Sequence, residues 1–148
     1  MKKMAIAVGM ESASKDGKIN YPSLEYDIKD IDLVIADVQR LQEEYGLGDA
    51  IIVKTKNGYH AHFFWDWNLS WEKVTEIVNN SRASEEFKKL SEHYGWRVIR
   101  VSGKYKDPDL KIVCRVKGKH NSDETGNMLF GIFRKLMNLK LPNEVLYE

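Results

Sequence analysis

Two histidines separated by one residue are the strongest chemical signal in the sequence. His60 and His62 lie in the segment 54–66, directly after the pair Asn57-Gly58. Alternate residues of a β-strand share a face and each residue adds about 3.3 Å, so the two imidazoles are predicted on one face, roughly 7 Å apart. Neutral imidazole binds metals and protonated imidazole binds phosphate, so the pair suits a divalent cation or an anionic ligand.

The Asn-Gly pair also predicts how these histidines are held. Asn and Gly tolerate positive φ, and Asn57-Gly58 stands between two β-prone runs, which indicates a hairpin with a two-residue turn. That turn places Thr55 beside His60 and Val53 beside His62. Both histidines are then expected on the same sheet face.

Positive charge is concentrated between residues 97 and 119. The basic residues there are Arg97, Arg100, Lys104, Lys106, Lys111, Arg115, Lys117 and Lys119. Strand alternation over 110–116 predicts one apolar face and one basic face that carries Lys111 and Arg115. A basic sheet face binds nucleic-acid phosphates, and the alternative is an edge strand whose charges deter aggregation.

The histidine hairpin and the basic segment that follows it together resemble the motifs of a known protein family. Residues 55–60, Thr-Lys-Asn-Gly-Tyr-His, are similar to the small-residue, x, His motif of archaeo-eukaryotic primases and primase-polymerases. Residues 98–108 look like the strand and turn that follow in those enzymes, where basic residues contact nucleotide or template. The resemblance implies a palm of RRM type with His60 at its catalytic centre. The phosphate-binding residues that it implies are His60, Arg100, Lys104, Lys111 and Arg115.

Metal ligands are a further implication of this resemblance. The family carries paired acids on a strand before the histidine, and the matching pair here is Glu25 and Asp27. Two-metal phosphoryl transfer needs such carboxylates to hold Mg²⁺ or Mn²⁺. Glu25 and Asp27, together with His62 of the histidine pair, are the candidate ligands of either ion.

Three interpretations of function stay open. The first is a nucleic-acid- or nucleotide-binding protein of replication with a primase-like palm, in which the polymerase metal site is lost. The second is an active enzyme, either a minimal primase-polymerase, which is a metal-dependent nucleotidyltransferase, or a nuclease. His60-Ala61-His62 also resembles the His-hydrophobic-His motif of rolling-circle replication initiators, which use a tyrosine nucleophile, here at best Tyr94. The third is a non-catalytic accessory interaction domain.

Composition sets limits on these interpretations. The chain has 148 residues, 43% of them hydrophobic, which predicts a single domain, 1–148, with a substantial core. The formal net charge is +1, so a basic surface must be local. The single Cys114 excludes an internal disulfide and a cysteine-based zinc site. No apolar run approaches membrane-spanning length, so we expect a cytoplasmic protein without membrane contact, whose partners are nucleic acid or nucleotides and other replication proteins.

Periodicity and turn signals predict the elements that must position the site. Strands are expected at 4–9, 23–27, 96–102 and 110–116, and a hairpin at 49–66. Helices are expected to begin near 27–30, at 70, at 84 and at 123. This order predicts the α+β class, with helices packed on one face of a mainly antiparallel sheet, as in an RRM or ferredoxin-like palm, and the other face free for ligands.

Overall fold

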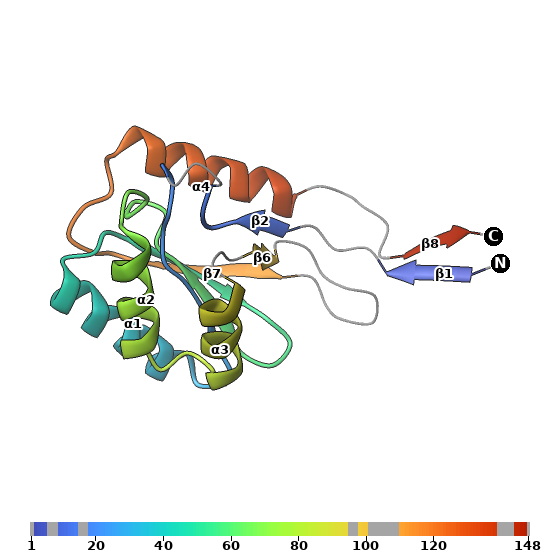
Figure 1. Cartoon of the computed structure of the whole chain (residues 1–148), viewed down its shortest axis with the longest axis horizontal. Helices are drawn as coiled ribbons and strands as arrows, with labels where there is room; N and C mark the ends of the chain where they lie inside the picture. The colour runs from blue at the N-terminus through green and yellow to red at the C-terminus, as the bar shows by residue number, and fades with distance from the viewer. Residues whose placement is uncertain are drawn as a thin grey trace.

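The computed structural model of the chain describes residues 2–5, 9–14, 18–94, 98–100, 110–138 and 144–147 (Figure 1). The main chain of these residues forms strands and helices in a mixed order. The elements are β1 (Lys2–Ala5), β2 (Gly9–Glu11), β3 (Ser23–Tyr26), α1 (Ile31–Tyr45), β4 (Ala50–Lys54), β5 (Tyr59–His62), α2 (Trp71–Asn80), α3 (Glu85–Tyr94), β6 (Val98–Arg100), β7 (Lys111–Val116), α4 (Glu124–Met137) and β8 (Glu144–Tyr147).

A four-stranded antiparallel sheet is the frame of the molecule. Its strand order is β3-β5-β4-β7, so the strand with the two histidines is central. β1 pairs with β8 and β2 pairs with β6 in two separate antiparallel ribbons. The predicted α+β class is confirmed.

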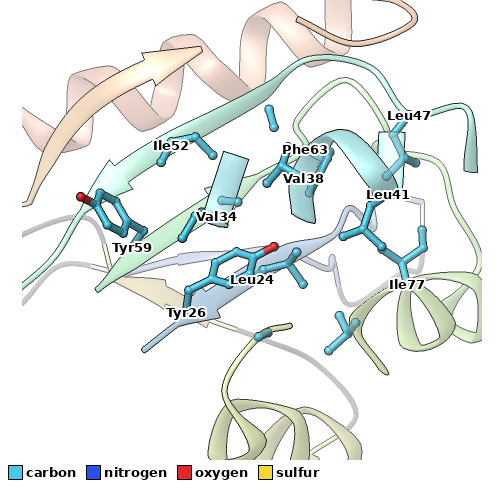
Figure 2. Packing of buried hydrophobic residues seen from close by; sticks show 14 of the residues in the cluster. Leu24, Tyr26, Val34, Val38, Leu41, Leu47, Ile52, Tyr59, Phe63 and Ile77 are labelled. Carbon is cyan, nitrogen blue, oxygen red and sulfur yellow. The ribbon is translucent and has the colours of Figure 1, made fainter. Parts of the chain in front are cut away.

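Local sequence explains how α1 forms. The Asp30 side chain accepts a hydrogen bond from the Asp32 N–H at the start of the helix, and Gly46 ends it with a φ of 66°. Val34, Val38 and Leu41 recur at helical spacing and are fully buried. They pack on the sheet against apolar side chains such as Leu24 of β3, Ile52 of β4 and Phe63, which follows β5 (Figure 2).

Helices lie on both faces of the sheet rather than on one. α1, α2 and α3 lie on one side, and α4 lies on the other (Figure 1). The second face carries Ile51, Val53 and Phe64, which are fully buried and form a separate apolar cluster with Leu129 and Phe133 of α4. The prediction of a free ligand-binding face is corrected accordingly, because these apolar side chains need cover that α4 provides.

The hairpin between β4 and β5 also differs from its prediction. Val53 stands opposite His60 and Ile51 opposite His62, a shift of two residues from the expected register. The turn is centred on Lys56-Asn57, because the Thr55 N–H donates to the Gly58 carbonyl. A shift of two residues keeps both histidines on one face, as predicted.

Gly58 follows the centre of the turn and packs closely against β3. A Cβ placed on Gly58 would lie 1.9 Å from the Tyr26 carbonyl oxygen. The glycine is therefore needed for close approach between two backbones rather than for positive φ.

Candidate functional site

His60 and Glu25 form the centre of the candidate site. They stand opposite each other on β5 and β3, and His60 Nε2 lies 3.7 Å from Glu25 Oε1. The imidazole is 9% exposed and the carboxylate is 43% exposed. A carboxylate and an imidazole that meet at a sheet surface are groups that bind polar ligands and transfer protons.

His62 is adjacent to this pair but has different surroundings. It is 1% exposed, and its ring lies 5.9 Å from that of His60, 5.5 Å from Phe64 and 5.1 Å from Phe133, between centroids. Its Nδ1 and the Ser23 hydroxyl are hydrogen-bonded at 2.9 Å. Burial, and then the nearby His60, lower the pKa of His62 well below 6.5. His62 is thus a neutral ring packed under α4, which does not suit it to bind phosphate.

The three predicted metal ligands do not converge. Glu25 faces His60, Asp27 is exposed just after β3, and His62 is buried under Phe133. Across the described ranges, no three His, Cys, Asp or Glu side chains are grouped closely enough to hold a metal ion. The residues described here therefore do not fit the Mg²⁺ or Mn²⁺ that the resemblance implies, since such ions need several oxygen ligands.

The predicted basic face is divided by an irregularity in the sheet. The β4–β7 register shifts between Ile52 and Val53, so that Ile51 faces Arg115 while Lys54 faces Lys111. Ile51 shares its face with His62, whereas Lys54 shares its face with the Tyr59 ring, 4.8 Å from the Lys54 amine. A bulge changes which residues of a strand point to each side, so Lys111 and Arg115 lie on opposite faces.

The remaining predicted residues lie at the ends of described elements or outside the described residues. Arg100 ends β6, where it pairs with Gly9 of β2. Lys104 lies outside the described residues. Tyr94, the candidate nucleophile of the initiator interpretation, is the last residue of α3.

Arg115 belongs to a polar network that the sequence did not predict. Its Nε donates to Asp49 Oδ2 at 2.7 Å, and its guanidinium lies 4.3 Å from the centre of the Trp65 ring. A second buried carboxylate, Asp66, accepts from the Gly48 N–H at 2.9 Å and lies 2.8 Å from His120 Nε2. Together these contacts hold the loop before α4 against the ends of β4 and β5. No sequence signal links the residues because they are distant along the chain.

The carboxyl of Asp49 gives the network a pH dependence. Burial alone would raise its pKa, but hydrogen bonds from the Gly118 N–H, Arg115 and Asn121 lower the pKa below the ordinary value of 3.8. An acid with a lowered folded-state pKa stabilises the fold above its unfolded-state pKa, and this contribution is lost as the pH falls through the folded-state value. Burial raises the pKa of the neighbouring Asp66, whose contribution has the opposite sign.

We therefore expect the Asp49→Asn variant to flatten the acid side of the stability profile. The measurement is the free energy of unfolding in urea at a series of pH values from about 6 to about 3. The wild type should lose stability more steeply than the variant below pH 3.8, the ordinary Asp value. Parallel profiles for the two proteins would show that Asp49 is not held by these hydrogen bonds.

Negative and positive charges are concentrated on different elements. Helices α1, α2 and α3 contain nine carboxylates and four Lys or Arg residues. The segment from β7 through α4 contains six Lys or Arg residues and two carboxylates. Lys111 lies on the face opposite to that of Arg115, and Lys119 pairs with Glu43 of α1. Arg115, Arg134 and Lys135 are therefore the residues that attract a polyanion to the α4 side.

Comparison of the chain with protein-family models, with curated proteins and with solved structures found no match. No helix in the described part of the chain is both long enough and apolar enough to cross a membrane.

Proposed function

We propose that this protein binds nucleic acid or nucleotides at the Glu25–His60 pair, beside the part of the sheet that α4 covers, as a replication-associated protein with a primase-like palm. The observation that carries the proposal is the pairing of Glu25 with His60. The resemblance places an acidic motif and a histidine motif in one site, and in this chain those two segments are adjacent antiparallel strands. In this proposal the protein works in the cytoplasm beside other replication proteins.

Electrostatics supports the same side of the molecule. Arg115 stands opposite Ile51 on the sheet face of His60. Arg134 and Lys135 lie on α4, which covers that face. Phosphate contacts dominate nucleic-acid affinity, so a ligand is directed to this side. Binding rather than nucleotidyl transfer is proposed because transfer needs a cluster of carboxylates for two metal ions, and the described residues contain none.

The His60→Ala variant tests the proposal. We expect about a tenfold weaker affinity for a fluorescein-labelled single-stranded oligonucleotide, because a hydrogen bond to a charged group contributes roughly 1.5–3 kcal/mol. Fluorescence anisotropy at several salt concentrations gives both the affinity and its salt dependence. His62→Phe is the matched control, since this buried ring lies among phenylalanines and its replacement should leave the affinity unchanged.

Glu25→Gln separates phosphate binding from metal binding. Removing a carboxylate beside His60 should strengthen the binding of phosphate, because it removes a repulsive charge. If Glu25 instead held a divalent ion, the same change would weaken any binding that depends on Mg²⁺ or Mn²⁺. No measurable affinity of the wild type for single-stranded DNA, single-stranded RNA or nucleoside triphosphates at about 50 mM salt would refute the proposed function.

A further inference from the structure

A groove runs between β7 and the C-terminal end of α4. Its volume is about 430 Å³, which is in the range of sites that hold a small organic group. The lining residues are Leu110, Lys111, Ile112, Arg134, Met137 and Asn138. The groove therefore combines apolar walls with positive charge.

Two arginines and an aromatic ring extend the groove along the seam between β7 and α4. The guanidinium of Arg134 lies 5.6 Å from the centre of the Phe130 ring, and that of Arg115 lies 5.8 Å from the same ring. Arg115 is also fixed by Asp49 and by the Trp65 ring. Guanidinium groups that are held on aromatic faces keep their planar donors oriented for phosphate oxygens.

The seam lies on the same sheet face as the candidate site. Ile112 stands opposite Val53, and Val53 stands opposite His60. Residues that are directly opposite in neighbouring strands share a face. The seam and His60 thus lie on the same sheet face, on either side of β4, whose Val53 is fully buried between them.

We infer that the β7–α4 seam binds a single strand of nucleic acid, an inference that rests on the proposed function. Arg115 and Arg134 contact its phosphates, and its bases pack on the apolar and aromatic side chains. Single-stranded nucleic acid combines these two features, because its phosphates alternate with exposed rings that stack on protein side chains. An acidic polypeptide pairs with the arginines through its carboxylates, but it lacks the regular alternation of negative charges and flat rings. The residues of the seam are Leu110, Ile112, Arg115, Phe130, Arg134 and Met137.

The salt dependence of binding tests the role of Arg134. Each phosphate contact contributes about 0.7 to the slope of log K against log salt for single strands. The Arg134→Gln variant should therefore reduce the slope by about 0.7 for an oligothymidylate, measured between about 50 and 200 mM salt. Lys135→Gln is the matched control, because Lys135 is the next residue of α4, is exposed and does not line the groove. Equal slopes for the wild type and Arg134→Gln would overturn the inference.

Photocrosslinking locates the strand independently of affinity. A benzophenone amino acid in place of Met137 should crosslink to the oligothymidylate, while the same group in place of Met128 should not. Met128 is 50% exposed on the same helix but does not line the groove. Equal crosslinking at both positions, or equal competition by polyglutamate at matched charge, would overturn the inference. If the wild type binds the oligonucleotide but the Arg134→Gln slope and the Met137 crosslink do not change as expected, binding in the seam is refuted and the proposed function stands. If the wild type binds no oligonucleotide, the proposed function is refuted.

Discussion

Replacement of Asp37 by Ala is expected to lower the free energy of unfolding by about 3–4 kcal/mol. The Asp37 carboxylate is fully buried and accepts from the Tyr26 hydroxyl at 2.8 Å, from Arg40 at 2.7 Å and from the Arg82 N–H at 2.9 Å. It thus joins β3, α1 and the segment between α2 and α3. Alanine would leave a buried tyrosine hydroxyl and a backbone N–H without an acceptor.

Urea unfolding of Asp37→Ala, Tyr26→Phe and the double variant measures this effect. Tyr26→Phe removes one donor and should cost only about 1 kcal/mol, because the carboxylate keeps its other two partners. The cost of the double variant should be less than the sum of the two single costs, since the hydroxyl that Asp37→Ala leaves unpaired is then absent. A loss below about 1 kcal/mol for Asp37→Ala would show that water or another group replaces the carboxylate. Tyr26 is next to Glu25 on β3. We therefore expect Asp37→Ala to lower the ligand affinity as well as the free energy of unfolding.

Local rules explain how much of the fold could be predicted. The cap at Asp30, the helical spacing of Val34, Val38 and Leu41, and the stop at Gly46 are all short-range signals, and the structure confirms α1 where they place it. The same holds for α2, where Ser70 caps the helix as expected. Elements whose signals lie within a few residues are predictable because their hydrogen bonds are also local.

The pairing of segments that are distant along the chain could not be predicted from these local signals. Nothing in segment 24–28 indicates that β3 lies beside β5, yet this pairing brings Glu25 to His60. The network of Asp49, Asp66 and His120 depends likewise on how β4, β5 and the loop before α4 meet. Such contacts depend on the packing of the whole sheet rather than on residue type or spacing.

The basic face shows how a single irregularity alters a prediction. Simple alternation through 110–116 put Lys111 and Arg115 together, and the bulge beside Val53 separates them. The predicted track of charge is thus only partly formed by β7. Arg134, which the sequence did not single out, instead lies against the same Phe130 ring as Arg115.

Replacement of Gly58 by Ala should both destabilise the fold and weaken ligand binding. The new Cβ would lie 1.9 Å from the carbonyl oxygen and 2.9 Å from the carbonyl carbon of Tyr26, and backbone atoms in a sheet cannot rotate away. We expect a loss of about 2–4 kcal/mol in the free energy of unfolding, in the upper range for overpacked sites. Relief requires β3 to move from β5, which would separate Glu25 from His60.

Gly131→Ala is the matched control for this glycine. It lies within α4, where a Cβ would meet no atom within 4 Å other than the nearby backbone of the helix itself, so alanine should stabilise the helix by about 0.5–1 kcal/mol. Urea unfolding gives the stabilities, and oligonucleotide anisotropy under folding conditions gives the affinities. If Gly58→Ala lowers stability but the folded variant binds like the wild type, the contact between Tyr26 and Gly58 supports the sheet without positioning the site. If the folded variant binds more weakly, close packing of β3 on β5 is what holds the carboxylate and the imidazole together.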